Sequence, residues 1–233
     1  MSPEYILHID TTGERGLVML SRQGIPIALL ENGNPMEHGS FLHPAIEKLM
    51  REQQLNKENI AAIAVANGPG SYTGLRVGLA AAKGLCYAWN IPLITLSSLQ
   101  LLAMAAKKKL EETGNATDVW IVPMIDARRM EVFYAIYDCA SMATIKEPGT
   151  VILDSFFLEN ELKIRTIVYT GNGISKWENI SKEGNAACIL PLITDNAFAQ
   201  QANQLFHEKQ FADLTYSQPS YAKEFFQQTS QKR

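Results

Sequence analysis

Hydrophobic and polar positions alternate with a short period at the start of the chain and with a helical period further on. Apolar runs at 5–10, 16–22 and 25–31 are separated by turn residues, which predicts three consecutive strands. We then predict a helix near 41–54, a buried strand at 60–66, a glycine-rich helix, a strand at 92–96 and a helix from about 98. The order βββαβαβα indicates an α/β domain in which helices pack on a mixed sheet.

The second half of the chain repeats the opening pattern. Ile9-Asp10 and Ile125-Asp126 each end an apolar run that leads through a polar turn into an alternating strand. The polar stretch 111–117 separates the halves, so we predict domains at 1–110 and 118–233, the second an abbreviated duplicate. Its later elements are predicted as a strand near 145–154, a helix near 155–162, a strand at 165–170, a helix to about 181, a strand at 187–191, a helix at 195–208 and a loose polar tail from Gln218.

This order of elements is that of the ribonuclease H-like domain. Two such domains facing each other across a cleft make up the actin-like ATPase superfamily, which is the fold class we predict. Members of that superfamily hold nucleotide between the turns of the two opening hairpins. Asp10, Thr11, Thr12 and Asp126 lie at those turns, and a carboxylate with neighbouring hydroxyls suits hydrated magnesium and phosphate.

The same aspartates have a second interpretation, because an aspartate at a strand end commonly caps its own turn. The adenosine turn expected for a nucleotide site has no Gly-Gly counterpart in the second half, where 170–173 is the nearest candidate. The four histidines lack metal-ligand spacing, and no serine nucleophile elbow is present. Nucleotide binding by the chain alone therefore stays an open alternative.

Composition describes an ordinary globular chain. Its 233 residues are 46% hydrophobic, enough for a sizeable core, and the net charge of −3 argues against a generally basic nucleic-acid surface. Three cysteines without paired spacing favour a reducing compartment. No leader or membrane span is evident, so we expect a cytoplasmic protein without a membrane partner.

The most distinctive segment of the chain runs from Asn67 to Leu85. It joins a buried strand to a helix through a glycine turn, and such a helix start can bind an anion. Two phosphate-binding templates fail on spacing: Lys83 lies mid-helix and is followed by Gly84-Leu85, and glycines 68, 70 and 74 are too widely spaced for a dinucleotide fingerprint.

Packing explains more of this segment. Gly74, Gly78, Ala81 and Ala82 are three and four residues apart, so they share a helix face that another backbone can approach closely. Glycine costs about 1 kcal/mol relative to alanine inside a helix, so Gly78 and Gly84 are not there for helix propensity. The face either packs on the chain's own sheet or binds a partner.

With these residues in place, the chain resembles the TsaB (YeaZ) family. The resemblance covers nearly the whole chain, and its main motifs are Ile9 to Thr12, Leu42 to Ile46, Asn67 to Leu85, Ile125 to Arg128 and Gly171 to Gly173. It implies an accessory protein in the synthesis of threonylcarbamoyladenosine in tRNA and a paralogue of the catalytic subunit TsaD.

The resemblance also shows where the chain departs from TsaD. TsaD carries a His-x-x-x-His pair that binds the catalytic metal, whereas Ser98 and Leu102 stand at the corresponding positions here. Serine and leucine cannot replace two imidazoles. We therefore expect no enzyme activity and no cofactor of its own, with ATP or ADP and metal belonging to the partner complex. The alternatives are an independent nucleotide-hydrolysing enzyme and, more remotely, a metallopeptidase-like protein.

The partners implied by the resemblance are TsaD, which pairs with TsaB through helices of the first domain, and the ATPase TsaE. The chain reaches tRNA indirectly through that complex, and a homodimer is expected when the chain is alone. We expect Gly78→Leu to weaken TsaD binding and to leave the fold intact. The predicted interface consists of Leu42, Ile46, Gly74, Val77, Gly78, Ala81 and Ala82.

Overall fold

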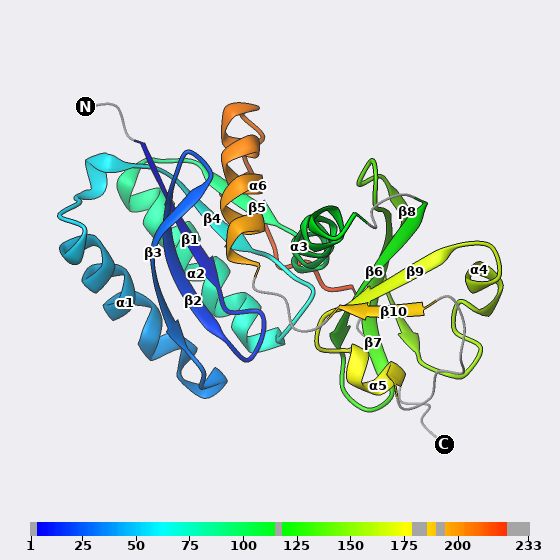
Figure 1. Ribbon diagram of the computed structural model, residues 1–233. Coiled ribbons are helices and arrows are strands. Elements are labelled where there is room, and N and C mark those ends of the chain that lie inside the picture. The colour runs from blue at the N-terminus through cyan, green and yellow to red at the C-terminus, as the bar shows by residue number, and fades with distance from the viewer. Residues whose placement is uncertain (1–3, 115–117, 179–185, 190–193, 223–233) are drawn as a thin grey trace, which may run out of the picture.

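A computed structural model describes residues 4–114, 118–178, 186–189 and 194–222. Two mixed sheets form two lobes, with a pair of helices between them (Figure 1). Residues 115–117 of the predicted linker and the end of the predicted helix beyond 178 lie outside the described residues.

The strands of the first sheet follow one another along the chain in the order predicted from the hydrophobic pattern. Its strands are β1 (Tyr5–Asp10), β2 (Gly16–Arg22), β3 (Ile25–Asn32), β4 (Ile60–Ala66) and β5 (Leu93–Leu96), arranged as β3-β2-β1-β4-β5. The first three strands pair antiparallel, and β4 and β5 join parallel to β1. This is the expected ribonuclease H-like sheet, and β4 is buried along its whole length as its continuous apolar run requires.

The second sheet has the same topology. Its strands are β6 (Val119–Asp126), β7 (Glu131–Asp138), β8 (Thr144–Ile152), β9 (Thr166–Thr170) and β10 (Ala186–Ile189), arranged as β10-β9-β6-β7-β8. Each strand therefore occupies the place of its counterpart in the first sheet, which confirms the duplicated fold. The helices between its strands, α4 (Glu159–Leu162) and α5 (Ile174–Glu178), are short, so this copy is abbreviated.

Helices cover both faces of the first sheet. On one face, α1 (His38–Glu52) and α2 (Tyr72–Trp89) pack over a core that includes residues from all of β1, β2 and β4. On the other face lies α6 (Asp195–His207), whose Phe198, Ala199 and Ala202 are buried against Met19 and its neighbours. Single 3₁₀ turns at Pro35–Glu37 and Lys57–Asn59 complete the connections.

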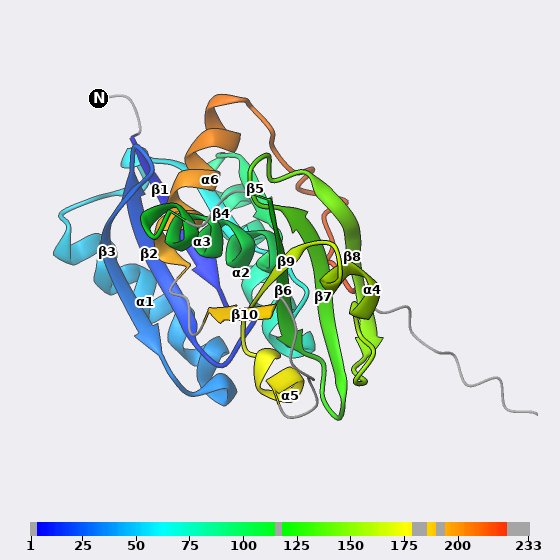
Figure 2. The same ribbon diagram turned by 45° about the vertical axis from the view of Figure 1, so that its right-hand side comes forward.

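The two halves exchange their last helices (Figures 1 and 2). Helix α3 (Ser98–Glu112) follows the first sheet but buries Leu99, Ala103 and Ala106 against the second, and α6 follows the second sheet but packs on the first. The predicted domains 1–110 and 118–233 divide the chain by sequence, whereas in space each half contributes its last helix to the other. Local sequence shows where a helix lies along the chain, whereas its apolar face decides which sheet it covers.

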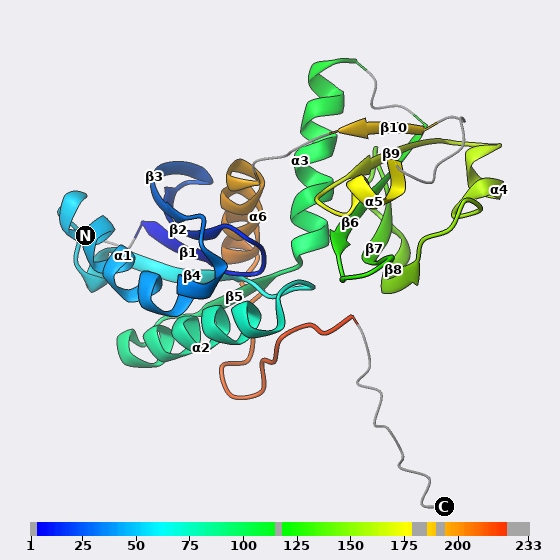
Figure 3. The same cartoon turned by 90° about the horizontal axis from the view of Figure 1, so that it is seen from below.

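Residues Ala212–Tyr221, here called the C-terminal strap, also return to the first domain (Figure 3). The amide of Ala212 donates to the carbonyl of Leu93 at 2.8 Å, at the edge of β5, and Leu214 packs on the core beneath α1 and α2. The polar tail predicted to be loose from Gln218 is therefore bound as far as Tyr221. Within the described residues, no helix combines the length and the hydropathy needed to span a membrane.

Candidate partner-binding surface and interdomain cleft

The turn before α2 is occupied by the chain's own groups. The amide of Ser71 donates to the carbonyl of Thr12 at 2.7 Å. The Ser71 hydroxyl caps the helix by accepting from the amide of Gly74 at 3.3 Å. These amides at the start of α2 bind internal oxygens, so the packing interpretation of the glycine segment fits the geometry better than the anion-binding one.

The small residues Gly74, Gly78 and Ala82 face β1. A Cβ added at Gly74 would lie 1.8 Å from the Thr11 carbonyl oxygen, and one at Gly78 would lie 2.4 Å from the Thr11 hydroxyl. That hydroxyl donates to the carbonyl of Gly74 at 2.7 Å. These three residues therefore let the helix pack on the chain's own sheet, which is the alternative that the sequence left open for them. A leucine at 78 has no room in the folded domain.

The face of α2 that points away from the sheet carries another set of small residues. Val77, Ala80, Ala81 and Gly84 border a groove between α2 and α1, with a cavity volume of about 350 Å³. Gly84 is exposed, and a Cβ added there would meet nothing within 4 Å. Gly84 therefore has open space around it, whereas Gly78 in the same helix is closely packed.

The groove tests the remaining interface predictions. From α1, Gly39, Leu42 and His43 form its other wall, whereas Ile46 lies in the core and does not border it. Of the seven predicted contacts, Val77, Ala81 and Leu42 line the groove. Sequence reasoning missed Ala80 and Gly84 because small residues occur on both sides of α2, and only the packing shows which side is open.

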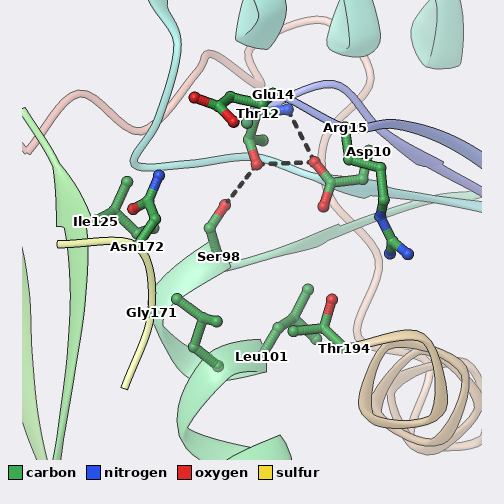
Figure 4. A pocket seen from close by; sticks show the side chains of 12 residues that line it. Asp10, Thr12, Glu14, Arg15, Ser98, Leu101, Ile125, Gly171, Asn172 and Thr194 are labelled. Atoms are coloured by element: carbon green, nitrogen blue, oxygen red, sulfur yellow. Dashed lines mark hydrogen bonds between the residues drawn. The ribbon is translucent and has the colours of Figure 1, made fainter. Parts of the chain in front are cut away.

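Between the domains lies a cleft whose inner part is lined by Asp10, Thr12, Ser98 and Asn172 and has a volume of about 260 Å³ (Figure 4). The amide and the hydroxyl of Thr12 donate to the Asp10 carboxylate at 2.8 and 2.7 Å. The Ser98 hydroxyl lies 3.4 Å from that of Thr12. Asp10 therefore caps the turn after β1, the alternative that the sequence left open.

Burial is the largest influence on Asp10 and raises the pKa of its carboxyl group. The hydrogen bonds from Thr12 and the charges of Arg15 and His38 oppose this rise. Arg15 also binds Asp195, which joins the first hairpin to the start of α6 at the edge of the cleft. The Asp10 carboxylate thus already accepts hydrogen bonds from the protein on the side that faces its turn.

Asp126 repeats the role of Asp10 in the second domain. Its carboxylate accepts from the amide of Arg128 at 2.5 Å and pairs with the Lys176 ammonium at 2.7 Å. Asp126 and Thr12 both border the outer part of the cleft, about 580 Å³ in volume. Thr11, by contrast, is buried toward α2, so three of the four residues predicted near nucleotide reach the cleft and Thr11 does not.

The candidate adenosine turn at 170–173 packs closely on β6. Gly171 has a φ of +97°, and a Cβ there would lie 2.3 Å from the carbonyl oxygen of Met124. The side-chain oxygen of Asn172 accepts from the amide of Asp126 at 2.9 Å. The turn therefore joins neighbouring strands of the second sheet.

Ser98 and Leu102, one turn apart at the start of α3, border the inner cleft beside Asp10. Within the ranges that the structure describes, no three His, Cys, Asp or Glu side chains gather as a metal site. His38, the first residue of α1, is buried, and its Nε2 lies 3.0 Å from the carbonyl oxygen of Gly13.

Comparison with known proteins places these features in a family context. Residues 35–224 match the family model described as "TsaD: tRNA N6-adenosine threonylcarbamoyltransferase". The chain is 30% identical over 224 residues to the Escherichia coli (strain K12) protein named tRNA threonylcarbamoyladenosine biosynthesis protein TsaB, with 93% of each chain covered. The Bacillus subtilis (strain 168) protein of the same name is 28% identical over 220 residues, again with 93% of each chain covered.

Solved structures share the fold. YeaZ from Pseudomonas aeruginosa superimposes with a TM-score of 0.73 at 22% identity, covering 95% of this chain and 100% of that one. The similarity extends across both sheets and the exchanged helices, since nearly the whole of each chain is matched.

Proposed function

Because the chain belongs to the TsaB family, we propose that it is a non-catalytic accessory subunit of the tRNA-modifying complex. It binds a TsaD-type subunit and supports transfer of the threonylcarbamoyl group to the adenosine beside the anticodon. TsaE joins the pair, tRNA is reached through the complex, and ATP or ADP and metal are held by the partners. All of this takes place in the cytoplasm.

The observation that carries this proposal is the open groove between α1 and α2. Ala80, Ala81 and Gly84 have little or no side chain, so a partner helix can approach the backbone of α2 closely. Val77 and Leu85, both partly exposed, supply apolar surface at the same groove, and the buried Leu42 lies beneath them. A helix pair from the TsaD-type subunit would complete a bundle here, and a second copy of this chain occupies the groove when that subunit is missing.

The cleft supports the non-catalytic part of the proposal. Asp10 and Asp126, its two opposed carboxylates, each cap their own hairpin turn. Ser98 and Leu102 line the cleft at the positions where the resemblance to TsaD implies histidines. These contacts favour an accessory role over nucleotide hydrolysis or peptide cleavage by the chain alone.

Gly84→Leu tests the groove. The added side chain projects into the groove without meeting its own domain, so the variant should fold and bind the cognate TsaD-type subunit at least tenfold more weakly in titration calorimetry. Gly149→Leu in β8 is the matched control, because a Cβ there meets only the Glu147 carbonyl oxygen at 3.9 Å, on the second domain. Unchanged affinity of a folded Gly84→Leu protein would exclude the groove as the docking site.

Reconstitution of tRNA modification tests the role itself. The chain alone should transfer no threonylcarbamoyl group, and the complex should lose activity when the chain is omitted. If the purified chain turns over ATP and Asp10→Ala abolishes that turnover, the independent-enzyme alternative is correct instead.

A further inference from the structure

The geometry of the C-terminal strap points to a second wall of the docking surface. We propose that the strap, on the side of α2 opposite α1, contacts the same TsaD-type subunit that fills the groove (Figure 3). This inference rests on the proposed function and extends its interface to a segment more than 120 residues away along the chain.

Two polar residues of the glycine segment, Lys83 and Asn67, bind the backbone of the strap. The Lys83 ammonium donates to the carbonyls of Thr215 and Ser217 at 3.2 and 3.0 Å. The Asn67 side-chain amide donates to the carbonyl of Gln218 at 2.9 Å, and the Asn67 carbonyl accepts from the amide of Ser220 at 2.8 Å. The polar positions that resemble a phosphate loop in sequence thus bind backbone of the same chain.

The end of the strap is fixed by an aromatic and cationic cluster. Arg76 Nε donates to the Tyr221 hydroxyl at 2.9 Å, and the guanidinium carbon lies 3.9 Å from the centroid of the Tyr72 ring. The rings of Tyr72 and Tyr221 are 5.5 Å apart. The hydrogen bond and the cation–π contact together hold the end of the strap against the first turn of α2.

The helical period of α2 arranges these contacts around its axis. Val77, Ala81 and Leu85 face α1, whereas Tyr72, Arg76 and Lys83 face the strap. The exposed ridge between the two sides is formed by Thr73, Ala80, Gly84 and Tyr87. A partner that rests on this ridge therefore meets α1 on one flank and the strap on the other.

The strap exposes an aromatic side chain on a turn whose backbone is held by hydrogen bonds. Tyr216 is 80% exposed, and Tyr87, one turn after Lys83 on α2, is 82% exposed. The Asp213 carboxylate accepts from the amides of Thr215 and Tyr216 at 2.7 and 2.8 Å, which fixes the turn. An exposed tyrosine on an already ordered turn loses little conformational entropy on binding, and tyrosine is enriched at interface hot spots.

Charge identifies the kind of contact expected from the partner. Within the described part of the chain, Arg76 and Lys83 have no carboxylate partner. Arg76 binds the Tyr221 phenol, and Lys83 binds two carbonyl oxygens of the strap. Both cations flank the ridge of α2. The facing surface of the TsaD-type subunit should therefore carry acidic side chains beside an apolar pocket for the tyrosine.

Titration calorimetry of the TsaD-type subunit against four proteins tests the inference: the wild-type chain, Gly84→Leu, Tyr216→Ala and the control Ile164→Ala. Ile164 is 74% exposed on the second domain, so its truncation is a matched loss of exposed apolar surface. We expect Tyr216→Ala to weaken binding about tenfold or more and Ile164→Ala to leave it unchanged. Tyr216→Ala and Ile164→Ala should keep the wild-type Tm because these positions are exposed, and Gly84→Leu should not lower it because leucine is favoured over glycine in a helix interior.

The outcomes separate the two proposals. If Gly84→Leu weakens binding and Tyr216→Ala does not, the strap inference is overturned and the groove stands. If the wild-type chain does not bind, or neither variant loses affinity, the proposed docking surface fails together with the strap. If sedimentation velocity shows that Tyr216→Ala changes only self-association, the strap contacts a second copy and the inference is overturned.

Discussion

Replacing Gly84 by alanine should stabilise the free protein and weaken its complex at the same time. Gly84 lies in the second half of α2, and an added methyl group meets no atom within 4 Å. In the free chain the only effect of the substitution is on the backbone, since alanine restricts the unfolded chain more than glycine does. The glycine at 84 thus reduces the stability of the free chain, although its surroundings leave room for a side chain. A partner helix that packs closely against this position would explain why a glycine is present.

The magnitudes follow from this geometry. Alanine is favoured over glycine by about 1 kcal/mol in a helix interior, which corresponds to a rise in Tm of about 2–4 °C for a chain of this size. In the complex, the methyl group forces a closely packed helix outward, and overpacking costs about 1–3 kcal/mol, a loss of affinity of about five- to 150-fold. The two effects have opposite signs, so general destabilisation cannot produce them.

Gly78→Ala is the matched control, six residues earlier in the same helix. Its methyl group would lie 2.4 Å from the Thr11 hydroxyl, so β1 or α2 must shift and the Tm should fall. Differential scanning calorimetry of the free variants and titration of the TsaD-type subunit measure both effects. A Gly84→Ala protein that binds with wild-type affinity would refute the close helix contact, and a lowered Tm would refute the open environment of Gly84.

Two further predictions concern buried titratable groups in the first domain. Burial lowers the pKa of His8 to about 3, so below pH 6.5 the unfolded chain binds a proton that the folded chain does not. The free energy of unfolding should therefore fall by up to about 1.4 kcal/mol per pH unit between pH 6.5 and 3. The double variant His8→Phe, Ser21→Ala removes both hydrogen-bonding partners. In urea unfolding, its stability should depend less on pH than that of the wild type. Burial raises the pKa of the Asp10 carboxyl group, so Asp10→Asn, which keeps an acceptor for the Thr12 amide, should increase the free energy of unfolding at pH 7. This gain should shrink as the pH falls, because the wild-type carboxyl group is then protonated. A gain that grows toward low pH would contradict this.

The strands, their order along the chain and the repetition of one fold in two halves follow from local sequence patterns. Alternating or continuous apolar runs such as 16–22 and 60–66 mark strands through a short-range period, and the order in which strands and helices follow one another limits the topology to a few choices. Turn chemistry is local too. Asp10 and Asp126 accept hydrogen bonds from residues only two positions ahead, which is why the turn-capping alternative could be stated from the sequence.

Which side of α2 is open depends on packing between distant parts of the chain. The helical period places Gly74, Gly78 and Ala82 on one stripe and Ala80, Ala81 and Gly84 on another, so composition does not distinguish the stripe that packs inside from the one that is exposed. The partners of Arg76 and Lys83, and the sheets covered by α3 and α6, depend in the same way on contacts between distant parts of the chain. A periodic pattern fixes the relative positions of side chains within one helix, but the rotation of that helix against the rest of the protein depends on packing with residues far away in sequence.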